Sequence, residues 1–235
     1  MSRIDAALER GRSFEGLKPL RINGVYDKLA LLVSMTAAVG IFSYKTVGSN
    51  VALGRILLPS MLIALGASLI GQFKPDFARI AAPVYAVAQG LVLGAVSKSY
   101  STLGGGLVPT ALAGTTVLFI ACLLVFRTGV VKVTPRFVQI VSIAGIALFG
   151  MYMLALVGLR IPGINEVGPR GLIFAVIGLG LGISYLFIDF DRIQKAEEAQ
   201  MLHNTAEWFL AFQLLLSLVM VYFNLLRLLA SSQRR

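Results

Sequence analysis

The stretch WFLAFQLLLSLVMVYFNLLRLLA, residues 208–230, decides the fold that we expect for this chain. Arg227 is its single charged residue, and most of its other positions are apolar. A helix of about 20 mostly apolar residues crosses the ~30 Å hydrocarbon core of a bilayer. The stretch therefore predicts a helix that spans a membrane.

Six more apolar runs precede this one, and together they predict a bundle of seven transmembrane helices. The expected spans are Leu29–Tyr44, Val51–Gln72, Ala78–Lys98, Leu107–Phe126, Phe137–Leu159, Gly171–Phe190 and Trp208–Ala230. Of the 235 residues, 57% are hydrophobic, and the mean hydropathy is +0.83, which is too apolar for an ordinary soluble domain. We expect an all-α polytopic membrane protein with one domain, at residues 29–230. Residues 1–28 form a short charged tail before it, and residues 231–235 a short tail after it.

The last span carries a polar stripe. Its members are spaced 4, 3, 4 and 3 residues apart, so they share one helical face: Gln213, Ser217, Met220, Asn224 and Arg227. Such a stripe is poorly solvated by acyl chains and should face other helices or water. We therefore expect the last helix at the centre of the bundle, enclosed by the other six.

The net charge of +10 is distributed as in a membrane protein rather than a nucleic-acid-binding protein. Lys and Arg gather in the first tail and in alternate connections: Lys74, Arg79, Arg127, Lys132, Arg136, Arg192 and Lys195. Under the positive-inside rule, this pattern predicts a cytoplasmic N-terminus. Seven spans then put the C-terminus outside, although the terminal Arg234 and Arg235 oppose that assignment.

Two carboxylates stand at the end of the sixth span, Asp189 and Asp191. Two residues apart on a helix, they point in different directions. Asp191 has Lys195 four residues on, which favours an ion pair on a solvated face. Asp189 shares its face with Tyr185 and Gly182, so we expect it to point into the bundle. A buried carboxylate can act as a proton-controlled latch, because burial penalises its charged form. A structural ion pair or a solvated charge at the helix end is the alternative.

Other polar residues of the spans give candidate sites along an ion pathway. Topology predicts an acidic inner layer, an uncharged polar middle layer and a basic outer layer. Glu207 belongs to the inner layer, Gln89 of the third span to the middle, and Arg55 and Arg227 to the outer layer. These two arginines could instead extend to the lipid headgroups.

The sequence lacks the motifs of an enzyme. It has no Gly-rich phosphate loop, nucleophile elbow or HExxH motif. The single histidine, His203, has no neighbouring cysteine or histidine, and the single cysteine, Cys122, lies in an apolar span. We expect no enzymatic activity, no cofactor and no metal site.

Small residues recur at helical spacing in the third and sixth spans. Ala86, Gly90 and Gly94 form one stripe, and Gly178 and Gly182 form another. In lipid, such stripes let helix backbones approach closely. They predict tight packing around these two helices.

Several segments together resemble the Bax inhibitor family (transmembrane Bax inhibitor motif proteins), and most closely its bacterial YccA-like branch. The segments are residues 25–28 (VYDK), 83–94 (PVYAVAQGLVLG), 188–193 (IDFDRI), 207–208 (EW) and 221–229 (VYFNLLRLL). The resemblance implies a seven-helix bundle with the last helix central, in a bacterial inner membrane. It also implies a pH-sensitive calcium leak, in which a carboxylate of the sixth helix pairs with one of the seventh.

The chain departs from that family pattern at two positions. Asp189 fits the first carboxylate, but Ser217 stands at the second, and Gln89 stands where the family often has Glu. Calcium prefers several oxygen ligands with carboxylates among them. These departures argue against a calcium-selective gate of two carboxylates, unless Asp191 or Glu207 supplies the second one.

Two functions of different classes follow. The first is a passive cation leak gated at Asp189, which would conduct calcium or other cations. The second is a non-conducting interaction protein that modulates a membrane protease or a membrane stress response. The charged tail before Arg21 would then be the contact for the partner.

Overall fold

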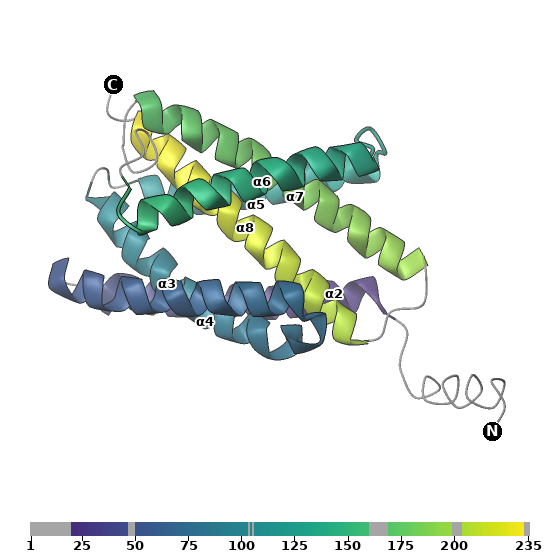
Figure 1. The fold of residues 1–235 in the computed structure, drawn as a ribbon, viewed down its shortest axis with the longest axis horizontal. Helices are drawn as coiled ribbons and strands as arrows, with labels where there is room; N and C mark the ends of the chain where they lie inside the picture. Colours follow the sequence, from purple (N-terminus) through teal and green to yellow (C-terminus); the bar gives the residue numbers. More distant parts are fainter. Residues whose placement is uncertain are drawn as a thin grey trace.

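The computed structural model describes residues 20–46, 50–102, 104, 106–159, 169–198 and 204–232. Within these ranges the chain forms seven long helices and one short 3-10 turn (Figure 1). The elements are α2 (Ile22–Thr46), α3 (Asn50–Phe73), η1 (Pro75–Phe77), α4 (Ala78–Ser101), α5 (Leu107–Arg127), α6 (Pro135–Leu156), α7 (Pro169–Glu198) and α8 (Asn204–Ser232). The all-helical architecture that we predicted is confirmed.

The seven helices coincide with the seven predicted spans, but several ends differ. α2 begins at Ile22, inside the charged segment, and α7 continues past Phe190 to Glu198. Charged residues do not stop a helix once it has left the hydrocarbon, so hydropathy alone misses these extensions. α6 ends earlier than predicted, at Leu156, where Gly158 takes a positive φ of 101°. That backbone conformation suits glycine and ends the helix.

Local sequence explains how helices begin at two of the connections. Thr134 caps α6 by accepting a hydrogen bond from the backbone N–H of Phe137 at 3.2 Å, and Pro135 occupies the first turn. Pro75 likewise occupies the first turn of η1 before α4, where no side chain caps the turn. Proline fits a first helical turn because its missing N–H has no acceptor there.

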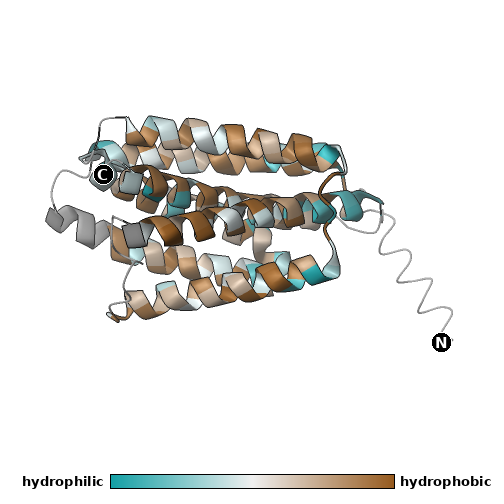
Figure 2. Cartoon of the chain, turned by 90° about the horizontal axis from the view of Figure 1, so that it is seen from above, coloured by the Kyte–Doolittle hydropathy of each residue, from teal (hydrophilic) through white to brown (hydrophobic). Residues whose placement is uncertain are grey.

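Length and composition suit the helices to a bilayer. Six of them can cross a membrane by these criteria: α2, α4 with η1, α5, α6, α7 and α8. The seventh, α3, is apolar over the part whose side chains the structure describes, Leu57–Phe73. Hydrophobic residues dominate the helix bodies in Figure 2, and many hydrophilic ones lie toward the ends of the bundle. The chain is a multi-pass membrane protein.

Two helices, α4 and α8, form the centre of the bundle. In each, 61% of the most apolar stretch is buried, against 11–33% in the other four helices that are long enough to span. α8 contacts α2, α3, α4, α5 and α7, as its oblique path through Figure 1 indicates. The predicted central position of the last helix is confirmed, and α4 shares that position.

Close backbone approaches join the central helices to their neighbours. Gly90 and Gly94 of α4 lie against the backbone of α2, where a methyl group at Gly94 would overlap the carbonyl oxygen of Gly40. Ser43 of α2 donates a 2.9 Å hydrogen bond to the carbonyl oxygen of Leu91 across this contact. The small-residue stripes therefore serve helix packing.

Candidate functional site

Asp189 and Ser217 form the centre of the candidate site. The Ser217 hydroxyl of α8 donates a 2.5 Å hydrogen bond to Asp189 Oδ2 of α7. Asp189 is 2% exposed and Ser217 is 6% exposed. This degree of burial excludes the interpretation of Asp189 as a solvated charge at a helix end.

Small residues of α7 bring the two side chains together. Gly182 lies against Val221, and Gly178 lies so close to Asn224 that a methyl group there would overlap the amide of that side chain. α7 and α8 therefore approach closely along these turns. Asp189 follows on the same face of α7, so the close approach sets it directly against Ser217.

Neither of the other two candidate carboxylates joins Asp189. Asp191 accepts a 2.6 Å hydrogen bond from Lys195 four residues on, in a pair whose lysine side chain is 63% exposed. The two residues border a groove between α7 and the connection from α5 to α6, which includes Lys132. Asp191 thus belongs to the surface of the bundle, as its spacing from Lys195 predicts.

Glu207 forms a separate cluster where α8 meets the start of α2. It accepts a 2.9 Å hydrogen bond from the backbone N–H of Arg21, and the Lys28 ammonium forms an ion pair with its other oxygen. Lys28 also lies 5.7 Å from the centre of the Trp208 ring. Gly24 leaves room for the carboxylate, because a methyl group there would overlap it. Glu207 therefore links the start of α8 to the start of α2.

The remaining members of the polar stripe face protein as well. The Asn224 side chain donates a 2.8 Å hydrogen bond to the Met220 carbonyl oxygen, and Arg227 donates one of 3.3 Å to the Tyr152 hydroxyl of α6. Both Asn224 and Arg227 are buried, whereas Gln213 is half-buried. The stripe thus follows the face that α8 turns toward α7, and it reaches α6 through Arg227.

The other sequence candidates lie apart from the Asp189–Ser217 contact. Gln89 is buried on α4, 9% exposed, and within the described residues it is hydrogen-bonded to neither Asp189 nor Ser217. The side chain of Arg55 lies outside the described part of the chain. So do His203, the terminal arginines Arg234 and Arg235, and residues 1–19 of the tail.

Comparison with protein families identifies the bundle. The chain matches the family model described as Bax inhibitor 1 like over residues 5–234. It belongs to the Bax inhibitor family. No curated protein sequence gives a significant match. Because the match covers nearly the whole chain, all seven helices and the Asp189–Ser217 contact lie inside the family region.

Sequence reasoning missed several polar contacts of this Bax inhibitor family protein, and two of them join α8 or α7 to other helices. Ser97 of α4 and Tyr222 of α8 share a 2.7 Å hydrogen bond between buried hydroxyls. The Tyr185 hydroxyl donates one of 3.4 Å to the Val141 carbonyl oxygen of α6. Tyr222 lies within the segment that carries the family resemblance, and this was the one available signal. Nothing in the spacing of Ser97 indicated its partner.

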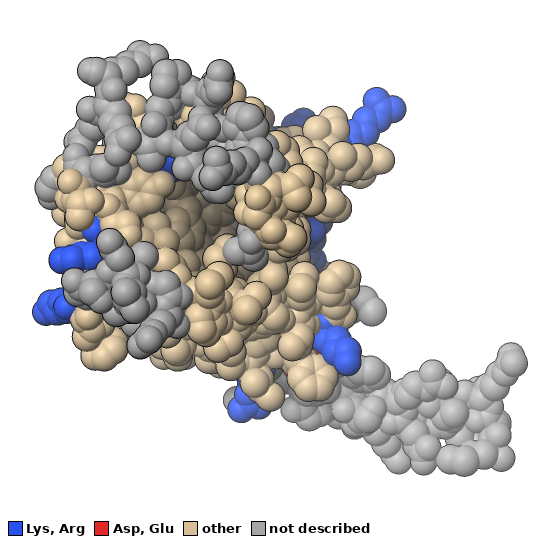
Figure 3. All heavy atoms as spheres, turned by 60° about the vertical axis from the view of Figure 1, so that its left-hand side comes forward, with Lys and Arg blue, Asp and Glu red and all other residues tan. Residues whose placement is uncertain are grey.

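The surface of this family member is hollowed at one end. Figure 3 shows the side where α7 begins and α8 ends, with a central hollow whose described walls are mainly uncharged. Among the described residues seen on this face, Lys and Arg lie around the edges and no Asp or Glu is visible. The hollow opens at the end of α8 opposite to Glu207, so the two features are separated along the bundle.

Proposed function

We propose that this protein is a passive cation leak in which Asp189 is a proton-controlled latch. The observation that carries the proposal is the burial of Asp189 against a neutral hydroxyl, at the contact of α7 with the central helix α8. Carboxylates inside membrane bundles are costly and usually mark ion or proton pathways. The hollow shown in Figure 3 is the proposed mouth of the pathway at the opposite end.

The charge state of Asp189 determines whether the proposed latch opens at low or at high pH. A dehydrated carboxylate is penalised when ionised, so the packed arrangement favours the protonated form. Ser217 is uncharged, and Arg192, the next cation along α7, is exposed. A ligand or proton shifts a two-state equilibrium toward the state that binds it more tightly. Loss of the proton should therefore favour conformations in which Asp189 is hydrated. We expect cation flux to increase as the pH rises.

The proposed leak discriminates weakly between cations. Calcium is bound best by six to eight oxygen atoms, several of them from carboxylates. The Asp189–Ser217 contact offers one carboxylate and one hydroxyl. Monovalent cations should therefore pass at least as readily as calcium.

The proposed location is a bacterial inner membrane, with the N-terminus in the cytoplasm. Support comes from the basic residues near the end of the bundle where α2 begins, which include Lys74, Arg127 and Lys132. Cytoplasmic connections of membrane proteins carry such an excess. The latch would then lie nearer the cytoplasmic end and the hollow nearer the outer end.

Flux through reconstituted liposomes tests the function. The purified chain is incorporated into vesicles that hold a potassium- or calcium-sensitive dye, and flux is followed between about pH 5 and pH 8. Asp189→Asn fixes a neutral side chain and should give low flux at every pH. Asp191→Asn is the matched control, because it removes a carboxylate that lies at the surface with Lys195. Absence of flux across the range, or equal flux in the wild type and Asp189→Asn, would refute the proposal.

A further inference from the structure

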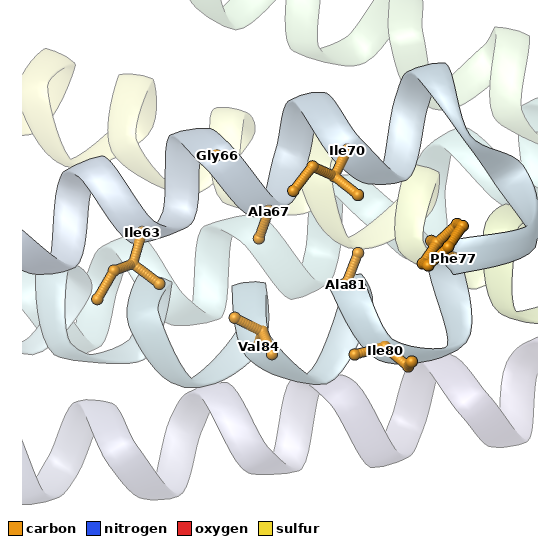
Figure 4. A pocket seen from close by; sticks show the side chains of 8 residues that line it. All are labelled: Ile63, Gly66, Ala67, Ile70, Phe77, Ile80, Ala81 and Val84. Carbon is orange, nitrogen blue, oxygen red and sulfur yellow. The ribbon is translucent and has the colours of Figure 1, made fainter.

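An apolar groove of about 380 Å³ runs between α3 and the start of α4 (Figure 4). Its lining comes from Ile63, Gly66, Ala67 and Ile70 of α3, and from Phe77, Ile80, Ala81 and Val84 of η1 and α4. The bulky side chains among these are largely exposed, so the groove opens away from the bundle core. It therefore faces the surrounding membrane.

Gly66 gives the groove its depth. A methyl group at Gly66 would meet no atom within 4 Å, so the space over this residue is open. On α3, Gly71 packs against Phe212 of the central helix, so closely that a methyl group there would overlap the ring. α3 is thus held at the core while its groove side stays open, and the groove is a fixed feature of the packed bundle.

The shape of the groove fits a flexible hydrocarbon chain better than another helix. Helices associate in lipid through small residues that let their backbones approach. Here the small residues form the floor, and the branched side chains of Ile63, Ile70 and Ile80 stand along the edges (Figure 4). These edges would hold a helix away from the floor, whereas an acyl chain can lie between them.

A cationic group marks the end of the groove. Lys74 Nζ lies 5.7 Å from the centre of the Phe77 ring, and Phe77 closes the groove at the turn between α3 and α4. Asp76 and Arg79 are also exposed, and their opposite charges cancel. Because Lys74 adds a further positive charge, this turn has a net positive charge. An apolar groove that ends at a cation matches a molecule with a hydrocarbon chain and an anionic head.

We propose that this groove binds a phospholipid of the bilayer. One acyl chain lies along the groove over Gly66, and the phosphate group is bound by Lys74. The site is separate from the Asp189–Ser217 contact, and it would fix the packing of α3 against α4 from the membrane side.

Native mass spectrometry of the full chain in detergent tests the proposal, with two lipids that share the same acyl chains. Dioleoylphosphatidylglycerol carries a phosphate, and dioleoylglycerol does not. Lys74→Gln should lower binding of the phospholipid by about five-fold, the effect of one interfacial charge, and leave dioleoylglycerol unchanged. Gly66→Leu fills the groove and should lower binding of both lipids.

Two matched controls belong to this experiment. Gly150→Leu adds the same side chain on α6, where a methyl group also meets no atom within 4 Å, and should leave binding unchanged. Lys132→Gln removes a lysine at the same end of the bundle, away from the groove, and should also have no effect.

Three outcomes would overturn the proposal. The first is equal loss of phospholipid in Lys132→Gln and Lys74→Gln, which would indicate a general charge effect. The second is unchanged lipid binding in folded Gly66→Leu. The third is a dimer that Gly66→Leu abolishes, which would assign the groove to a second copy of the chain. Lys74→Gln alters only an exposed side chain, so its result decides the phosphate contact even if Gly66→Leu does not fold.

Discussion

Glu207, in the first turn of α8, is ion-paired with Lys28 of α2, a residue 179 positions earlier in the chain. The same carboxylate accepts the backbone N–H of Arg21, directly before the first residue of α2. One side chain thus both pairs a lysine and caps the start of a neighbouring helix. Carboxylates stabilise helix N-termini, because the N–H groups there lack partners within the helix.

Two substitutions of Glu207 should destabilise the bundle to different extents. Glu207→Gln keeps an oxygen for the Arg21 N–H and loses the charge, at a cost of about 1–3 kcal/mol for a partly buried pair. Glu207→Ala loses both contacts and should cost more. Thermal unfolding in detergent, followed by circular dichroism, measures the order. Glu198→Gln, which alters an exposed residue of α7, is the control and should stay within about 0.5 kcal/mol of wild type.

The contact between α2 and α4 gives a second test of stability. Gly94→Ala would push a methyl group into the Gly40 carbonyl oxygen, and backbone atoms cannot move aside as a side chain can. We expect a loss of about 1–3 kcal/mol, typical of overpacking, with the Ser43 hydrogen bond to Leu91 weakened. Gly66→Ala is the control, because its methyl group enters open space. Equal unfolding temperatures for the two variants would contradict the packing assigned to Gly94.

Sequence patterns predicted the central position of α8 but not that of α4. The polar stripe from Gln213 to Arg227 separates an interior face from a lipid face, because polar groups are costly in hydrocarbon. α4 offers little such contrast. Its buried side chains are mostly small and apolar, for example Ala82, Ala86 and Ala95. A lipid-facing helix can be equally apolar, so burial leaves little trace in the hydropathy of α4.

The candidate site, too, was predicted from the sequence only in part. The inward direction of Asp189 follows from its helical face, and the family resemblance pointed to Ser217 as the opposing position. The ion pair between Lys28 and Glu207 was not predicted from the sequence, although both residues lie in segments that carry the resemblance. Their pairing depends on how the start of α2 meets the start of α8. That relation is set by three-dimensional packing and has no spacing rule in the sequence.

Removal of the Ser217 hydroxyl should make stability more dependent on pH. Ser217→Ala takes the donor away from a buried carboxylate, and hydrogen bonds to charged groups contribute about 1.5–3 kcal/mol against 0.5–1.5 kcal/mol for neutral ones. The loss should therefore be larger near pH 8 than near pH 5. Ser231→Ala is a suitable control, because its buried hydroxyl has no hydrogen-bond partner in the part of α8 and its surroundings that the structure describes. A Ser217→Ala loss that does not vary with pH would show that Asp189 keeps one charge state throughout.

A second carboxylate at position 217 should change ion selectivity. Ser217→Asp replaces the hydroxyl by two carboxylate oxygens within reach of Asp189, since the present hydroxyl lies 2.5 Å from Asp189 Oδ2. Calcium gains more than potassium from paired carboxylates, because it is a hard divalent cation that takes oxygen ligands. We therefore expect the ratio of calcium flux to potassium flux in liposomes to rise. Ser217→Asn introduces a side chain of nearly the same size as that of Ser217→Asp but without the charge. It therefore separates the effect of charge from the effect of shape. If Ser217→Asn raises the ratio as much as Ser217→Asp does, the effect comes from the width of the pathway, and Asp189 is not part of a cation-binding pair.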